Sequence, residues 1–391
     1  MTTILQARTD PSHVTEVGVA RRLSAPRRPL RVCYMIDELT TAGTETQLLA
    51  LIRSLDRRRV TPYLCLLRGQ DERSRKLEPR ECPVLRLGVR SLARPRGLIT
   101  AWRLVRFLRE QQIEVMQVYF PDSTYLGIAG AWLARVPRIV RTRNNLGYWM
   151  TPWHRRLGRM CNWFTDVLVA NCEASRQAVL RDEKLPAERV LVLENGVDLD
   201  RFPLTKRKTE RRPRRVGVVA NLRPVKGLDT FVRAGSLLAA SHSDVTFHVA
   251  GEGPLRSELG RLAAECGLKD RFTFAGVTDD VPRFLADLDI AVLPSRSEGM
   301  SNALLEYMAG GKAIVATAVG GNVQLIANEI HGLLVAPDDS GQLAAAMNRL
   351  LDNGALADRL GRAARLRVEE SYSREAMVRR FEDFYERLIC A

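Results

Sequence analysis

The amino-acid sequence predicts an α/β protein made of two doubly wound domains, each a parallel sheet covered by helices. Its 391 residues are too many for one ordinary core and suit two domains. From Leu30 onward, short apolar runs alternate with amphipathic stretches, which is typical of successive strand–helix units. Between residues 206 and 215, seven of ten positions are lysine or arginine, as expected of a solvated linker between the domains.

Apolar runs in the first half predict seven strands, at 31–36, 60–66, 84–87, 115–119, 138–141, 167–170 and 190–193. Amphipathic stretches between them predict helices, for example over 45–54 and 97–111. We therefore expect an N-terminal domain over residues 29–205. Residues 1–28 are rich in arginine and lack the apolar stretch of a secretory signal, so we expect a disordered basic arm there.

The second half repeats the alternation, with strands predicted at 216–220, 245–250, 272–275, 290–293, 313–317 and 333–335. Helices are predicted between them, including 228–240, 254–266 and 301–310, and three further helices close the chain, the last over 374–389. We expect a C-terminal domain over residues 206–373. In open parallel sheets ligands bind outside the carboxyl ends of the strands, so the residues at those ends are the candidates for function.

The seven cysteines are scattered, odd in number and without the Cys-x-x-Cys spacing of a metal site. This usage indicates a reducing compartment and no disulfide framework. The longest apolar stretch, over 126–134, is much shorter than the roughly 18–20 residues that span a bilayer. We therefore expect a cytoplasmic protein.

Positive charge is concentrated in the first half. Residues 1–215 contain 41 lysines and arginines against 22 acidic residues, whereas residues 216–391 contain 19 against 23. The sequence shows no nucleic-acid motif and no interleaving of aromatic and basic residues, so we expect no nucleic-acid partner. An anionic membrane surface or a phosphate-bearing acceptor fits the charge. The alternative is a compositional habit, since 53 of the 60 basic residues are arginine.

The richest polar segment follows the strand predicted at 290–293. Glu298 lies in the loop at the end of that strand, and Glu306 lies about 7–8 Å along the following helix. Four residues between them place backbone amides at the helix N-terminus, where anions bind: Gly299, Met300, Ser301 and Asn302. Two carboxylates flanking such a site suit a nucleotide sugar, whose hydroxyls lie on both sides of its phosphates. The alternative is a loop acid and a glutamate favoured by the helix dipole.

Basic residues and glycines follow other predicted strands. Arg223 and Lys226 lie in the loop after the first strand of the second half, where they could stabilise the charge of a leaving diphosphate. Gly43 follows the first strand of the chain, and Gly251 and Gly253 follow the strand at 245–250; each could bring backbone amides close to a phosphate. Each of these residues also has an ordinary explanation, as a solvated side chain or a tight turn.

In this order, these segments resemble the group 1 retaining glycosyltransferases of family 4, which have the two-domain GT-B fold. The segments that carry the resemblance are 43–45, 170–175, 195–198 with Phe202, 221–227, 251–254, 298–306 and 319–321. The resemblance implies two Rossmann-like domains facing a central cleft, the N-terminal one binding the acceptor and the C-terminal one the nucleotide sugar. It also implies that the last helix, within 374–391, crosses back to the N-terminal domain.

The resemblance assigns roles to the site residues. Glu298 would contact the donor sugar, and Glu306 the ribose hydroxyls. Lys226, together with Arg223, would bind the diphosphate, so that Arg223, Lys226 and Glu298 form the catalytic set. Many members carry an arginine two residues before Arg223, at the position of Asn221.

The sequence departs from the family pattern on the acceptor side. Many members carry a histidine in the segment that corresponds to 116–123, and this chain has none there, its five histidines lying at 13, 154, 242, 248 and 331. The polar residues at the predicted strand ends are our candidates for positioning the acceptor or the sugar: Tyr119, Asp122, Arg143 and Asn144.

The sequence thus predicts a retaining glycosyltransferase that moves a hexose-type sugar from a nucleotide-diphosphate sugar to a glycan or lipid-linked acceptor, in cell-surface polysaccharide or glycolipid synthesis. We expect no cofactor and no metal, because no Asp-x-Asp motif stands at a strand end. We expect the protein to be peripheral on the inner face of the cell membrane. Two alternatives remain, a nucleotide-sugar epimerase of the same fold and a catalytically idle, membrane-associated subunit.

Overall fold

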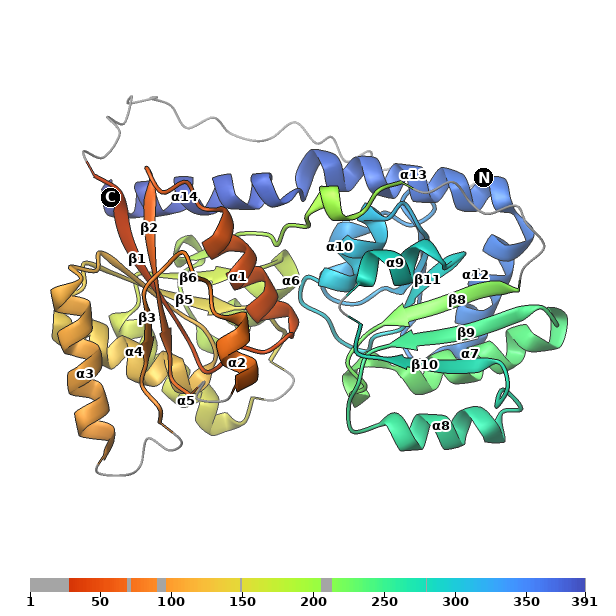
Figure 1. Cartoon of the computed structure of the whole chain (residues 1–391), viewed down its shortest axis with the longest axis horizontal. Coiled ribbons are helices and arrows are strands. Elements are labelled where there is room, and N and C mark those ends of the chain that lie inside the picture. The colour runs from red at the N-terminus through yellow and green to blue at the C-terminus, as the bar shows by residue number, and fades with distance from the viewer. Residues whose placement is uncertain are drawn as a thin grey trace, which may run out of the picture.

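The computed structural model describes residues 28–68, 72–89, 96–147, 150–204, 213–278 and 280–390, and it contains two parallel β-sheets (Figure 1). The predicted arm up to residue 27 and the predicted linker up to residue 212 lie outside the described residues. We had expected the whole basic run, up to residue 215, to be linker, but its last two residues belong to a strand. Arg214 and Arg215 begin the first strand of the second sheet, where the guanidinium of Arg214 pairs with Asp244 at 2.8 Å.

The first sheet has the strand order β3-β2-β1-β4-β5-β6-β7. Its strands are β1 (Leu30–Ile36), β2 (Val60–Leu66), β3 (Val84–Arg86), β4 (Val115–Val118), β5 (Arg138–Arg143), β6 (Val167–Ala170) and β7 (Val190–Val192). Its helices are α1 (Gly43–Ser54), α2 (Glu72–Leu77), α3 (Arg96–Glu110), α4 (Pro121–Ala134), α5 (Pro152–Cys161) and α6 (Glu173–Glu183), with short 3-10 turns η1 (Asn162–Phe164), η2 (Ala187–Arg189) and η3 (Leu199–Arg201).

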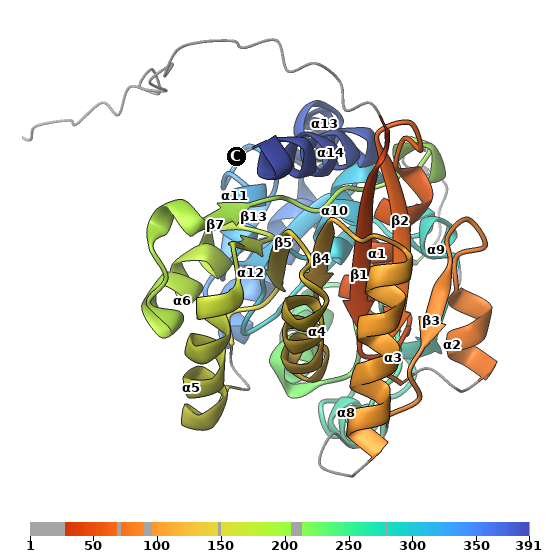
Figure 2. The same cartoon turned by 90° about the vertical axis from the view of Figure 1, so that its left-hand side faces the viewer.

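Side-chain alternation along β1 builds a core on each face of this sheet. Tyr34 and Ile36 pack with apolar residues of α1 and of the last helix of the chain, whereas Cys33 and Met35 pack under α3 and α4. Successive residues of a strand point to opposite faces, so a strand that is apolar at every position is covered by helices on both sides. Figure 2 shows α3 and α4 on the side of the sheet turned away from α14.

The second sheet has the order β10-β9-β8-β11-β12-β13. Its strands are β8 (Arg214–Val219), β9 (Val245–Ala250), β10 (Phe272–Gly276), β11 (Ile290–Leu293), β12 (Ala313–Thr317) and β13 (Leu333–Val335). Around it lie η4 (Pro224–Lys226), α7 (Leu228–Ser241), α8 (Arg256–Glu265), α9 (Val281–Ala286), α10 (Asn302–Ala309), α11 (Asn322–Leu325), α12 (Ser340–Asp352) and α13 (Gly354–Ser371).

The last helix, α14 (Arg374–Cys390), returns to the N-terminal sheet and packs against α1 (Figure 1). Tyr385 of α14 is fully buried and donates from its hydroxyl to Gln117 Oε1 at 2.6 Å, while Glu382 accepts from Arg59 at 2.8 Å. Just before this helix the amide of Arg374 donates to the carbonyl of Val197 at 2.9 Å. These contacts confirm the predicted crossing.

Each sheet reverses its strand order at one place, between β1 and β4 in the first and between β8 and β11 in the second. In an open α/β sheet the loops that leave such a switch point diverge and leave a crevice for a ligand. Every candidate residue from the sequence follows one of these four strands or a neighbouring one. Within the described part of the chain, no helix is both long enough and apolar enough to cross a membrane.

Candidate active site between the two sheets

The loops that leave the two switch points contact each other across the domain boundary. Asn302, at the start of α10, donates from Nδ2 to the carbonyl of Gly43 at 2.9 Å. Its Oδ1 accepts from Asn195 Nδ2 at 2.8 Å and from Gln47 Nε2 at 3.1 Å. The predicted Gly43 and Asn302 are therefore adjacent, although 259 residues separate them in the sequence.

Lys226 and Glu298 form a buried ion pair in the C-terminal domain. Glu298 has 8% of its surface exposed, and its Oε1 accepts from Lys226 Nζ and from Ser295 Oγ, each at 2.7 Å. Its Oε2 has no hydrogen-bond partner among the residues that the structure describes, which leaves one carboxylate oxygen for a ligand. A cation and a carboxylate held together at a switch point can bind the phosphate and the hydroxyls of one ligand.

Gly227 explains why Lys226 reaches Glu298. This glycine has a φ of +59°, and a Cβ at its position would lie 2.1 Å from the carbonyl oxygen of Pro294. A residue with a side chain would push the β8–α7 loop away from the β11–α10 loop. The close approach of the two loops sets Lys226 beside the carboxylate that follows β11.

Arg223 does not join this pair. It is exposed, and no hydrogen bond among the described residues links its side chain to Lys226 or Glu298. Its charge instead acts on Glu45 in α1: burial raises the pKa of the Glu45 carboxyl, and Arg223 partly offsets that rise. The structure thus places Arg223 opposite the N-terminal domain, in reach of the cleft.

The glycines that follow β9 serve packing between loops. Gly251 has a φ of +140°, and a Cβ there would lie 2.0 Å from the carbonyl oxygen of Ala220. At Gly253 a Cβ would lie 2.6 Å from the carbonyl oxygen of Leu222. Both glycines therefore hold the β9–α8 loop against the loop of Arg223, which accounts for their presence without a ligand. Their role in donor binding stays a prediction.

The start of α10 forms the N-terminus that the sequence predicts. Ser301 Oγ caps it by accepting from the amide of Leu304 at 3.3 Å. The amides of the first turn have no partner within the helix, so they can bind an anion next to Glu298. Met300 is buried, with its sulfur accepting from the amide of Asn195 at 3.2 Å, and Gly299 lies against the carbonyl of Asn144. The segment is therefore seated against the N-terminal domain.

Glu306 lies on the side of α10 that faces the N-terminal domain. It shares a small pocket with Gln47 of α1 and with Asp198, Arg201 and Arg374. Burial raises the pKa of its carboxyl to about 7, and Arg201 opposes that rise. No hydrogen bond to another described residue engages the carboxyl group, so it is available to a hydroxyl-bearing ligand. Whether that ligand is a ribose stays a prediction.

Replacing Glu306 with glutamine should flatten the dependence of stability on pH. A carboxyl whose pKa rises on folding stabilises the protein fully below about pH 4.5 and loses that contribution as the pH passes 7. Between pH 5 and pH 8 the wild type should lose about 2 kcal/mol of unfolding free energy that Glu306→Gln retains. Urea denaturation at the two pH values measures this difference. Glu370→Gln, at an exposed position of α13, is the control and should behave as the wild type.

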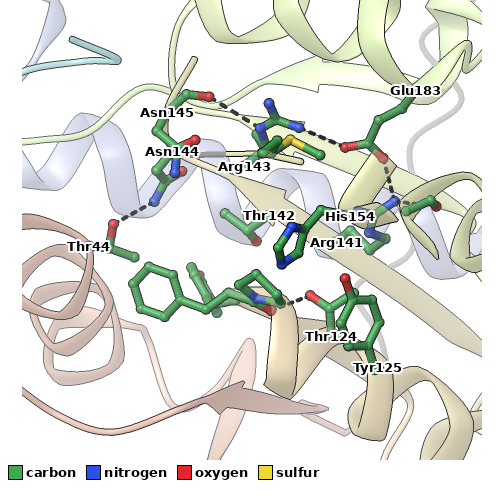
Figure 3. Close-up of a pocket in the computed structure, with 15 residues that line it drawn as sticks. Thr44, Thr124, Tyr125, Arg141, Thr142, Arg143, Asn144, Asn145, His154 and Glu183 are labelled. Atoms are coloured by element: carbon green, nitrogen blue, oxygen red, sulfur yellow. Dashed lines mark hydrogen bonds and ion pairs between the residues drawn. The ribbon is translucent and has the colours of Figure 1, made fainter. Parts of the chain in front are cut away.

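A second pocket lies in the N-terminal domain, where β4 and β5 end (Figure 3). We call it the N-terminal pocket. It is lined by Thr44, Tyr119, Phe120, Pro121, Thr124, Tyr125, Arg141, Thr142, Arg143, Asn144, Asn145, Met150, His154, Gly158 and Glu183. Three of the four residues that we selected for the acceptor belong to it: Tyr119, Arg143 and Asn144. The fourth, Asp122, does not line it and instead pairs with Arg68 on the surface.

Buried charges form the inner wall of the N-terminal pocket. Glu183 is 2% exposed and accepts from Arg143 at 2.8 Å and from Arg141 at 2.7 Å, one arginine on each carboxylate oxygen. Asp182 also lies 3.6 Å from Arg143, so two carboxylates balance the two arginines at this wall. Tyr119 is buried, and burial raises the pKa of its phenol well above the ordinary value, so this hydroxyl stays neutral.

His154 is a functional candidate that the sequence did not identify. It stands in the first turn of α5, where its Nδ1 lies 2.7 Å from Thr151 Oγ1, and its ring projects into the N-terminal pocket near Thr142 and Arg141 (Figure 3). The expected histidine is absent from 116–123, yet the fold brings another one to the pocket lined by Tyr119. The sequence alone does not indicate this position of His154, because α5 follows β5, whereas the expected histidine would follow β4.

Two family models match most of the described chain. Residues 213–353 match glycosyl transferases group 1, and residues 41–201 match glycosyltransferase family 4. The 2-deoxystreptamine glucosyltransferase of Streptomyces kanamyceticus is 33% identical over 190 residues, which is 45% of this chain and about half, 49%, of that protein. An Escherichia coli galactosyltransferase, named for transfer from UDP-Gal to alpha-D-GlcNAc-diphosphoundecaprenol, is 24% identical over 72% of this chain and 77% of its own length.

Solved structures share the architecture. The Anabaena protein HepE, crystallised with UDP-glucose, superposes with a TM-score of 0.79 at 19% identity, over 91% of this chain and 99% of that one. At this identity the likeness shows the fold, two Rossmann-like domains facing a cleft, as the sequence predicts.

Proposed function

The chain belongs to the group 1 glycosyltransferases of family 4, and from that premise we propose that it transfers a hexose-type sugar, with retention, from a nucleoside diphosphate to a glycan or lipid-linked acceptor. The observation that carries the proposal is the Lys226–Glu298 pair. It lies at the switch point of the C-terminal sheet, beside the N-terminus of α10. A cation, a carboxylate and free helix amides together suit a diphosphate that is joined to a sugar.

In the proposed reaction the bond between the sugar's anomeric carbon and the diphosphate breaks, and its electron pair stays on the phosphate oxygen. The acceptor hydroxyl attacks the same face of the sugar and gives its proton to the departing phosphate. Lys226 and the amides of α10 stabilise the negative charge that develops there. Glu298 holds the sugar through its unpaired Oε2, and Glu306 holds the ribose. Catalysis then depends on positioning and on fixed charges.

The N-terminal pocket is the proposed acceptor site. In its wall, Arg141 Nε and Arg143 Nη2 make no hydrogen bond to a described residue, which suits an acceptor that carries a phosphate or carboxylate near the reactive hydroxyl. The E. coli relative is named for a diphosphate-linked acceptor, which supports this class. We propose that the enzyme works in the cytoplasm, where all seven cysteines would stay free thiols, as they are in the structure.

A panel of nucleotide sugars tests this function. With a lipid-diphosphate-linked sugar as acceptor, one nucleotide sugar should release nucleoside diphosphate in proportion to the glycoside formed. An epimerase would change the nucleotide sugar without an acceptor, and an idle subunit would release nothing from any member of the panel. Either result contradicts the proposal.

Metal removal should leave the reaction unchanged. Lys226, held beside Glu298 at 2.7 Å, supplies positive charge where the diphosphate would bind. We therefore propose a metal-independent enzyme. Initial rates in excess EDTA should equal those in magnesium. A loss of most of the activity in EDTA, restored by magnesium, would show that a metal ion takes part.

A further inference from the structure

Exposed apolar side chains gather on one part of the N-terminal domain. Of the 15 large apolar residues that are exposed in the described chain, eight belong to α3, α4, α5 and η1: Ile99, Trp102, Trp132, Leu133, Trp153, Met160, Trp163 and Phe164. The four tryptophans among them have 58%, 58%, 63% and 82% of their surface exposed. An exposed tryptophan loses free energy in water, so four in one region indicate a binding surface.

These residues lie on neighbouring helices. Helix α3 packs against α4, and α4 packs against α5, so the three form one layer over the sheet (Figure 2). Trp132 of α4 and Phe164 of η1 meet edge to face, with ring centres 5.8 Å apart. We call this layer, with its eight exposed apolar residues, the aromatic–basic face. The fold brings these aromatic and basic residues together from separate segments of the sequence.

The same layer is strongly positive. Residues 96–164 contain eleven arginines and three acidic residues, and each acidic side chain already has a basic or amide partner. Exposed arginines stand among the aromatic residues: Arg103, Arg106, Arg109, Arg135, Arg155, Arg156 and Arg159. Arg155 and Arg156 form no ion pair with any residue that the structure describes. Their charge is therefore available to a partner outside the chain.

This combination matches the interface of an anionic bilayer. Tryptophan and long cationic side chains bury an apolar body at the level of the headgroups and keep a polar end in water. Each basic residue near an anionic leaflet adds electrostatic attraction to it. Protein–protein interfaces are also enriched in aromatic residues and arginine, but here eleven arginines stand against three acidic residues over 96–164, and this excess of one sign suits an anionic surface. The observations thus favour a lipid surface over a second protein.

The face adjoins the acceptor side of the cleft. Trp153 precedes His154, which lines the N-terminal pocket, and Arg155 and Arg156 follow it on the same helix. We propose that the protein rests on an anionic bilayer through the aromatic–basic face, and that this contact presents the headgroup of a lipid-linked acceptor to the N-terminal pocket. The presentation of an acceptor rests on the proposed function, whereas the membrane contact does not.

Vesicle flotation of the full chain tests the contact. The probes are vesicles of phosphatidylcholine alone and of equal parts of phosphatidylcholine and phosphatidylglycerol. We expect flotation with the anionic vesicles only, and a loss of about tenfold or more in affinity for two variants, Trp102→Ala/Trp163→Ala and Arg155→Glu/Arg156→Glu. Matched controls in the C-terminal domain, Leu237→Ala/Leu366→Ala and Arg233→Glu/Arg261→Glu, remove residues that are also exposed and should float as the wild type does.

Other results would overturn the proposal. It fails if the wild type does not float with anionic vesicles, or if the variants of the face float as well as their controls. It also fails if sedimentation shows a dimer that the tryptophan variant loses while vesicle binding is unchanged, because the face would then bind a second copy. Thermal unfolding of each variant establishes that it is folded. Release of nucleoside diphosphate in detergent with a soluble acceptor reports the enzyme function separately. A failure of the membrane contact is therefore distinguishable from a failure of the proposed function.

Discussion

Replacing Lys226 with alanine should lower kcat by about 100- to 1,000-fold, the effect of removing one preorganised donor from a developing anion. Lys226 Nζ is held by Glu298 at 2.7 Å, so the cation is in place before the substrate binds. The loss should fall mainly on kcat, because charge on the leaving diphosphate develops as its bond to the sugar breaks. Initial rates over a range of donor concentrations separate kcat from KM.

Two controls distinguish a direct loss of catalysis in Lys226→Ala from damage to the fold. Lys226→Ala leaves the Glu298 carboxylate buried without its partner, which costs about 3–5 kcal/mol of stability in such pairs. The double variant Lys226→Met/Glu298→Gln should recover much of that stability and still lack activity. Lys269→Ala, an exposed lysine of the same domain, should match the wild type. Activity that returns together with stability in the double variant would contradict a catalytic role for Lys226.

Replacing Glu298 with glutamine should reduce kcat/KM by about 10- to 100-fold, the range for losing a charge-assisted hydrogen bond. The amide keeps the shape of the carboxylate and removes the charge that holds Lys226 and Ser295. Both donor binding and the position of Lys226 should suffer. Calorimetric titration with the nucleotide sugar and steady-state rates measure the two effects. Glu265→Gln in α8 is the matched control, and equal kinetics for both variants would exclude Glu298 from the site.

Most of the fold follows from local patterns in the sequence. Each of the 13 strands lies where an apolar run predicts it, because most residues of a strand that is covered on both faces are apolar. The ends of the strands are predicted less accurately than their positions: β5 continues to Arg143, two residues beyond the predicted end. Polar strand ends such as this one belong to the site, and hydrophobicity gives no signal there.

The donor side of the site was also accessible from the sequence. Glu298, Ser301 and Asn302 lie within five residues of one loop and helix start, so their proximity is local. The acceptor side was accessible only in part: Tyr119, Arg143 and Asn144 were predicted and line the N-terminal pocket, but Glu183 and His154 were not predicted. Glu183 and His154 reach the N-terminal pocket from two helices, and the charge of Glu183 matters only because it meets Arg141 and Arg143 at the end of β5. Contacts between distant segments depend on the packing of the whole domain, which no spacing along the chain reveals.

Following one turnover by NMR tests the proposed retaining transfer most directly. The reaction contains an acceptor and the nucleotide sugar that supports release of nucleoside diphosphate. We expect one nucleoside diphosphate for each glycoside, and a product whose anomeric carbon has the configuration of the donor. An inverted product, or a new nucleotide sugar formed without any glycoside, would contradict it.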